Sequence, residues 1–190
     1  MVSFTLDTNC MIDVAEERPL AVDVRRLLAA HKTSEADVAL VAASASERQL
    51  GGDFLSSVER FNERRNELGF GDLEILPSIG RWNISFWDES LYTWNEGEAR
   101  EELIFSVLFP GSHYEWAESA ETAGVDVGDE TSRAYHLWRN KILDAQAYWA
   151  HEHAKRDIFV TSDQRFCNLH DHPDFPNAII NTPDEAAARL

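Results

Sequence analysis

Short apolar segments alternate with longer amphipathic segments along this chain, and this alternation is the strongest constraint on its fold. Helices are expected after the first strand, through Ile12 and Val14, and at 20–30, 46–68 and 134–155, with a short helix near the end. Strands separated by helices form a mainly parallel sheet covered by helices on both faces. The sequence therefore predicts an α/β fold with a central, mainly parallel sheet of about five strands. The predicted strands are 3–7, 37–44, 73–77, 157–163 and 177–183.

One segment, 78–133, departs from this alternation. It contains four of the six tryptophans, and its twelve acidic and three basic residues account for nine of the 17 net negative charges of the chain. We expect a mostly helical insertion within a single domain of residues 1–190. Its tryptophans are expected to form a small core of their own, and a surface for a partner is the alternative interpretation.

The charge and composition restrict the classes of function. A net charge of −17 argues against a protein that binds nucleic acid through bulk electrostatics, so a polyanionic substrate would need a local basic patch or metal ions. Abundant acids with only three lysines suggest a protein adapted to high salt. No membrane-spanning run or signal-peptide pattern is present, and Cys10 and Cys167 lack the spacing of a disulfide framework. We therefore expect a cytoplasmic protein without a membrane segment.

Four acidic residues stand at places where a binding site can form. Asp7 and Asp163 each end a buried strand, Glu47 follows the second strand, and Asp144 lies on a largely apolar face of the predicted helix 134–155. Three of them have an ordinary alternative role, because Asp7 and Asp163 can cap the following turns and Glu47 can complete a capping box with Ser44. Asp144 has no such role, since an unpaired carboxylate on an apolar helical face is costly.

Ligands gather outside the carboxyl ends of the strands in open parallel sheets, and Asp7 and Asp163 share that edge. Carboxylates about 4 Å apart repel each other by roughly 4 kcal/mol at an effective dielectric constant near 20. Such a cluster is stable if it holds protons or binds a hard divalent cation, and oxygen ligands favour Mg²⁺ or Mn²⁺. A structural zinc site is a weaker alternative, because His151 and His153 point to different helical faces and the loop 170–173 lacks a second ligand pair.

Four short motifs, found in order along the chain, resemble the PIN domain family and in particular its single-domain toxin ribonucleases of prokaryotic toxin–antitoxin pairs. The motifs are "LDTNCMID", "ASASERQL", "ILDAQAYWAHEHA" and "FVTSDQRF". The resemblance implies a PIN-like fold and a hydrolase, a Mg²⁺- or Mn²⁺-dependent endoribonuclease, that cuts RNA. It also implies a homodimer and, if the chain is a toxin, an antitoxin protein as partner. The resemblance assigns catalysis and metal binding to Asp7, Glu47, Asp144 and Asp163, with Thr8, Asn9 and Thr161 in supporting roles.

The sequence departs from the family at one position of the expected site. Many members have another acid two residues after the last aspartate, and this chain has Arg165 there. That arginine could weaken a second metal position or provide a cation near the scissile phosphate. A phosphohydrolase with Asp7 as nucleophile is a further alternative, but it would need an aspartate where Asn9 stands. A PIN-like interaction module with little catalytic activity, binding a protein or RNA partner, is the non-enzymatic alternative.

Overall fold

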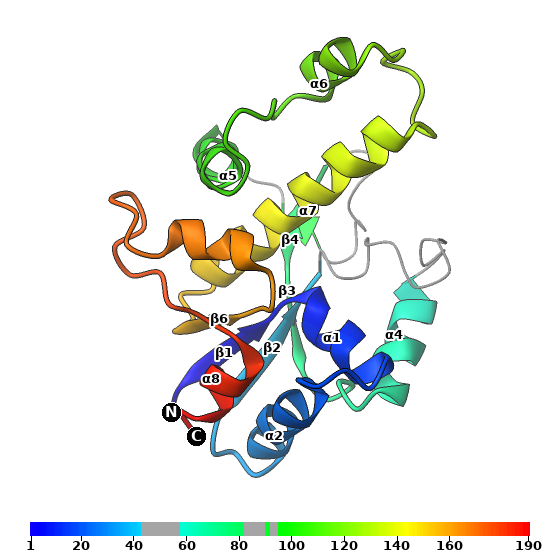
Figure 1. The fold of residues 1–190 in the computed structure, drawn as a ribbon. Helices are drawn as coiled ribbons and strands as arrows, with labels where there is room; N and C mark the ends of the chain where they lie inside the picture. Colours follow the sequence, from blue (N-terminus) through cyan, green and yellow to red (C-terminus); the bar gives the residue numbers. More distant parts are fainter. Residues whose placement is uncertain (43–57, 82–89, 92–94) are drawn as a thin grey trace.

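The predicted α/β architecture is present, with a five-stranded parallel sheet and helices on both faces (Figure 1). The computed structural model describes residues 1–42, 58–81, 90–91 and 95–190. The strand order in the sheet is β3-β2-β1-β6-β7, and every neighbouring pair is parallel. The strands are β1 (Ser3–Leu6), β2 (Asp37–Val41), β3 (Glu74–Leu76), β6 (Ile158–Val160) and β7 (Ile180–Asn181).

The strands are shorter than the sequence predicted. β2 ends at Val41 rather than at residue 44, and β6 ends at Val160 although the apolar segment was predicted as strand to 163. A short parallel pair, β4 (Ser78–Ile79) with β5 (Ser90–Leu91), was not predicted. The helices are α1 (Thr8–Ala15), α2 (Ala21–Lys32), α4 (Val58–Glu67), α5 (Asn95–Leu108), α6 (Trp116–Ala123), α7 (Arg133–His153) and α8 (Pro183–Ala187), with a 3₁₀ helix η2 (Gln164–Leu169).

Two hydrophobic cores lie on opposite faces of the sheet. Phe4 and Leu6 of β1 pack with side chains of α1, α2, α4 and α8. Val41 of β2 and Phe159 of β6 pack with side chains of α5, α7 and η2. Successive residues of a strand point to opposite faces, so strands that are apolar throughout fit a sheet covered on both sides. This burial explains why the central strands read as continuous apolar runs.

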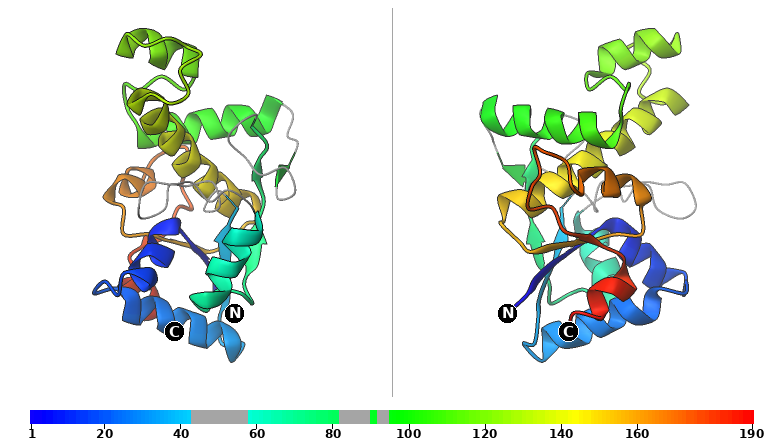
Figure 2. Two further views of the ribbon diagram at one scale, coloured as in Figure 1. Left: turned by 90° about the vertical axis from the view of Figure 1, so that its right-hand side faces the viewer. Right: turned by 60° about the vertical axis from the view of Figure 1, so that its left-hand side comes forward.

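Helices α5 and α6 pack on α7, and α6 lies at the end of α7 that extends beyond the sheet (Figure 2). Trp116 of α6 contacts Tyr135 and Trp138 of α7, with ring centroids 5.1 and 5.6 Å apart. The expectation of a separate small core is therefore wrong for Trp116, whose aromatic cluster is shared with α7. The tryptophans at 82, 87 and 94 lie outside the described residues, as do residues 46–57 of the predicted helix 46–68.

The strand order creates a switch point between β1 and β6. From β1 the chain continues outward through β2 to β3, whereas β6 and β7 lie on the other side of β1. Ligand sites of open α/β sheets form at such points, outside the carboxyl ends of the strands. Asp7 follows β1 directly, and Thr161 and Asp163 follow β6, so the fold brings these predicted site residues to its switch point.

Candidate functional site

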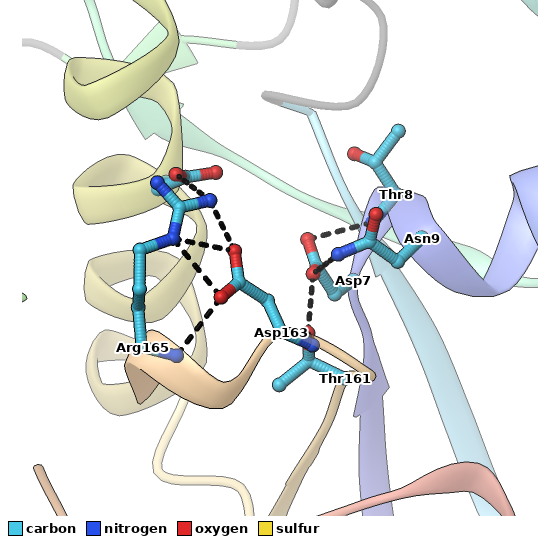
Figure 3. A network of polar contacts seen from close by, with 7 residues as sticks. Asp7, Thr8, Asn9, Thr161, Asp163 and Arg165 are labelled. Carbon is cyan, nitrogen blue, oxygen red and sulfur yellow. Dashed lines mark hydrogen bonds and ion pairs between the residues drawn. The ribbon is translucent and has the colours of Figure 1, made fainter. Parts of the chain in front are cut away.

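The Asp7 carboxylate lies at the end of β1 and is fixed by three hydrogen bonds (Figure 3). Its Oδ1 accepts from the backbone N–H of Thr8 at 2.8 Å, which caps the N-terminus of α1. Its Oδ2 accepts from Asn9 Nδ2 at 2.9 Å and from Thr161 Oγ1 at 2.6 Å. The ordinary capping role is thus fulfilled, and the additional bonds from Asn9 and Thr161 hold the carboxylate in one orientation.

Thr161 connects the acids that follow β1 and β6. Its hydroxyl donates to Asp7 and accepts from the backbone N–H of Asp163 at 3.0 Å. Asp163 in turn caps η2 by accepting from the N–H of Arg165 at 2.9 Å, as the capping alternative predicted. Asn9 and Thr161 thus orient the Asp7 carboxylate through their side chains, and Thr8 contributes its backbone N–H.

Asp144 reaches the same place from α7. Its side chain is 15 % exposed, and its neighbours Leu143 and Ala145 are fully buried. Together with Asp7, Asn9 and Asp163 it lines a cavity of about 350 Å³, here called the acidic cavity. Three of the four acids predicted from separate parts of the sequence therefore meet. The fourth, Glu47, lies outside the described residues.

Two of the three carboxyls have raised pKa values. Burial raises the pKa of Asp144 well above its ordinary value, and the charges of Asp7 and Asp163 raise it further, against the opposing effect of Arg165. Burial also raises the pKa of Asp7, and hydrogen bonds from Thr161, Thr8 and Asn9 offset only part of this effect. When both carboxyls are ionised, the positive charge near them is too small to offset their burial and mutual repulsion. Such a pair of carboxylates favours the binding of a cation or a proton.

Asp163 behaves differently because of Arg165. Burial would raise the pKa of Asp163, but hydrogen bonds and the charge of Arg165 lower it overall. The guanidinium group binds Asp163 through Nε, 2.8 Å from Oδ2, and through Nη2, and it lies 3.2 Å from Asp144 Oδ2 (Figure 3). It also lies over the Phe109 ring, 5.1 Å from the centroid. Arg165 therefore bridges two acids of the cavity.

The sequence reasoning considered Arg165 only as a departure from a motif. Arg165, from η2, is also the ion-pair partner of Asp144. The short spacing in "DQR", in which an acid that caps a turn precedes an arginine by two residues, is the signal that could have indicated the Asp163–Arg165 pair. Asn140 and Lys141, which also line the acidic cavity, were not predicted as site residues.

The donor set suits a hard divalent cation, but the described acids are not arranged as a finished metal site. Carboxylate oxygens from three elements, with the Asn9 side chain beside them, are the ligand chemistry of Mg²⁺ and Mn²⁺. Within the described part of the chain, however, no three His, Cys, Asp or Glu side chains are grouped closely enough to hold a metal ion. The cation that the structure places against these carboxylates is the guanidinium group of Arg165, which contacts both Asp144 and Asp163.

The two histidines near the end of α7 have different surroundings. His151 is buried and its Nδ1 lies 2.9 Å from Thr5 Oγ1, whereas the His153 ring stacks on Trp149 with centroids 4.6 Å apart. Each ring is therefore accounted for by packing or hydrogen bonding, and the pair does not converge on one point.

Comparison with known proteins gave no relative, since no family model, no curated protein and no solved structure matches the chain. The resemblance to the PIN domain family therefore remains a prediction from short motifs. Among the residues that the structure describes, no helix is both long enough and apolar enough to cross a lipid bilayer.

Proposed function

We propose that this protein is a ribonuclease that uses Mg²⁺ or Mn²⁺ held by Asp7, Asp144 and Asp163, with Glu47 as a further candidate ligand. The observation that carries the proposal is the convergence of three acids, from β1, α7 and the end of β6, on one cavity at the switch point of the sheet. Burying such acids together is unfavourable, and the raised pKa values of Asp7 and Asp144 express that cost. Functional sites are where such arrangements are concentrated.

The residues of the chain would divide the work as follows. Asp7, fixed by Thr161 and Asn9, presents the remaining lone pairs of its carboxylate to the cavity without needing to reorient. Asp144 and Asp163 would provide further oxygen ligands at the same cavity. A divalent cation bound here supplies Lewis-acid chemistry, which activates water and stabilises negative charge on a phosphodiester.

Arg165 has two tasks under this proposal. Before a cation binds, it partly neutralises Asp163 and Asp144, as its contacts indicate. If a cation neutralised these acids, the guanidinium group would be free to bind a phosphate oxygen, for which its planar set of donors is well suited. An arginine at this position thus supports a site that alternates between an internal ion pair and a bound substrate.

The test is cleavage of end-labelled single-stranded RNA pools by the purified chain with Mn²⁺, Mg²⁺ or EDTA. We expect cleavage with either metal, none with EDTA, and at least a hundredfold loss in Asp144→Asn. Asp171→Asn is the matched control, because its side chain is 93 % exposed and the chemical change is the same. Metal-independent cleavage, or an Asp144→Asn variant as active as the control, would overturn the proposal.

A second candidate function is that of an interaction module that binds a protein or RNA partner and whose acidic cavity has no catalytic activity. The observation that favours it is the contact of Arg165 with two of the three acids, which gives the site an internal cation. Absence of cleavage on all RNAs tested, together with absence of Mn²⁺ binding, would favour this function. A cytoplasmic location, a homodimer and an antitoxin partner belong to the ribonuclease proposal and rest on the motif resemblance alone.

A further inference from the structure

A second cavity adjoins the acidic cavity. It has a volume of about 260 Å³ and lies between α6 and α7; it is here called the helix groove, and residues 111–113, 119, 122–123, 134, 137–138 and 141 line it. Leu137 and Lys141 line both cavities. The two hollows are therefore neighbours, and these two side chains form their common boundary.

One face of α7 runs from the helix groove to the acids. Leu137, Lys141 and Asp144 are spaced by four and three residues, which places them along a single face of the helix. Leu137 is 53 % exposed, whereas Trp138 beside it is almost completely buried and donates from Nε1 to the Tyr114 carbonyl at 2.9 Å. The groove thus includes one exposed apolar side chain and one buried, hydrogen-bonded indole, which is a lining that suits an aromatic ring.

Lys141 provides positive charge at the boundary. Its Nζ donates to Ser112 Oγ at 2.8 Å, and in the described structure it forms no ion pair with a carboxylate. Arg165, in contrast, is already bound to Asp163 and Asp144. The ammonium group of Lys141 also lies 5.7 Å from the centroid of the Phe109 ring, so its described contacts leave its charge without a neutralising carboxylate where the two cavities meet.

The charges around the helix groove limit the length of a polyanion that can bind there. The start and body of α6 and the following loop carry six acids, at positions 115, 118, 121, 126, 129 and 130. These charges repel the phosphates of a strand that continues along α6. The volumes of the two cavities are also at or below the lower end of the range for small-ligand sites.

We propose that the helix groove is a subsite for a single nucleotide of single-stranded RNA, next to the phosphate that lies over the acids. The base would lie against Leu137 and the phosphate would contact Lys141. Phosphates further along α6 would add no binding free energy. An unpaired base can enter such a pocket, whereas a base within a duplex cannot. This inference rests on the proposed ribonuclease function and adds the class of substrate and the residues that select it.

The test is binding of fluorescently labelled RNA of three, six and twelve nucleotides to an Asp7→Asn background, in Mn²⁺ and in EDTA. We expect affinity that does not increase beyond three nucleotides and that depends weakly on salt. Each phosphate contact to a single strand contributes about −0.7 to the slope of log K against log salt concentration. Lys141→Gln should therefore reduce the magnitude of that slope by about 0.7, and Leu137→Ser should weaken binding without changing it.

Lys155→Gln is the matched control, because Lys155 is also a lysine without an ion pair in the described structure but lines cavities away from the acids. If RNA cleavage by the wild type occurs but Lys141→Gln and Lys155→Gln bind RNA equally, the subsite is refuted and the ribonuclease function stands. Length-independent binding that depends on Lys141, without cleavage, would support the subsite and refute the nuclease. Affinity that grows with every added nucleotide, or no RNA binding at all, would overturn the inference.

Discussion

The hydroxyl of Thr161 donates a 2.6 Å hydrogen bond to the buried carboxylate of Asp7, across the switch point between β6 and β1. The same oxygen accepts the N–H of Asp163, so one hydroxyl connects two acids that are 156 positions apart in the chain. A hydrogen bond to a charged group contributes more than one between neutral groups, about 1.5–3 kcal/mol. Thr161 therefore determines how Asp7 is presented to the cavity.

Thr161→Val removes this bond and preserves the shape of the side chain. We expect the free energy of unfolding to fall by about 2 kcal/mol in urea titrations, because the Asp7 carboxylate is left with fewer donors while it stays buried. RNA cleavage should fall at the same time. Thr161→Ser keeps the hydroxyl and should retain most of both properties, so equal losses in the two variants would show that the hydrogen bond from the hydroxyl does not account for the effect.

Asp144→Asn should stabilise the protein when no metal is present. The amide has nearly the same shape as the carboxyl and carries no charge, so it removes the repulsion from Asp7 and Asp163. We expect a gain of about 1 kcal/mol in the free energy of unfolding at pH 8 in EDTA. The gain should shrink as the pH falls, because the raised pKa of Asp144 means that the folded wild type takes up a proton there before the unfolded chain does. Loss of stability at pH 8 would contradict this account.

Arg165→Gln should loosen the site and favour metal binding. The guanidinium group stabilises Asp163 and Asp144, but its side chain is 50 % exposed, so we expect a loss of no more than about 1 kcal/mol in stability without metal. Since the variant frees two acids, Mn²⁺ should bind several-fold more tightly, as measured by electron paramagnetic resonance. Arg165→Lys keeps the charge and is the control. Weaker Mn²⁺ binding in Arg165→Gln than in Arg165→Lys would show that the arginine organises the site instead of competing for it.

The sheet and three of the site acids could be predicted because each depends on local pattern and chain direction. Apolar segments separated by helices determine a parallel sheet, and an acid at the carboxyl end of such a strand must lie at one edge of it. Asp144 was recognisable because its neighbours Leu143 and Ala145 are apolar, and both are buried. These inferences needed no knowledge of distant contacts.

The partner of Asp144 and the ends of the strands could not be predicted, because both depend on contacts between distant elements. β6 stops at Val160, and the next residue, Thr161, uses its side chain to reach Asp7. The direction of the long Arg165 side chain depends on the Phe109 ring beneath it and on Asp144 across the cavity. No local pattern in the sequence contains that information.

His151 should make stability depend on pH in the acidic range. Burial, and then the charge of Arg156, lower the pKa of His151 from 6.5 to about 4. Between these values the unfolded chain binds a proton that the folded chain does not, so stability contributed by the neutral ring is complete above pH 6.5 and is lost as the pH falls toward 4. The loss amounts to about 3 kcal/mol. Urea titrations of wild type and His151→Gln from pH 7.5 to 4 should give curves that converge on acidification; parallel curves would refute the shift.

The ion pair between Arg81, two residues after β4, and Glu101 of α5 joins these two parts of the chain. Removing one or both of its charges should lower the free energy of unfolding by amounts that can be ranked. Glu101 is completely buried, its Oε1 lies 3.1 Å from Arg81 Nε, and Arg81 also donates to the Tyr114 hydroxyl. Burial raises the pKa of Glu101, and the attraction of Arg81 offsets only part of this effect. Arg81→Met alone leaves a buried acid without its cation, which should cost about 3–5 kcal/mol at neutral pH.

The cost of Arg81→Met should fall as the pH is lowered, because the raised pKa of Glu101 lets it take up a proton in the folded state before the unfolded chain does. Glu101→Leu alone leaves the Arg81 guanidinium, whose side chain is 16 % exposed, and should be destabilising by a smaller amount because that charge retains some access to water. The double variant Arg81→Met/Glu101→Leu buries two apolar groups in place of two charges and should recover most of the loss. Chemical unfolding of the four proteins gives the coupling free energy directly. Additive single effects would mean that the two charges do not stabilise each other, and the packing of α5 would then have to be explained by its apolar contacts alone.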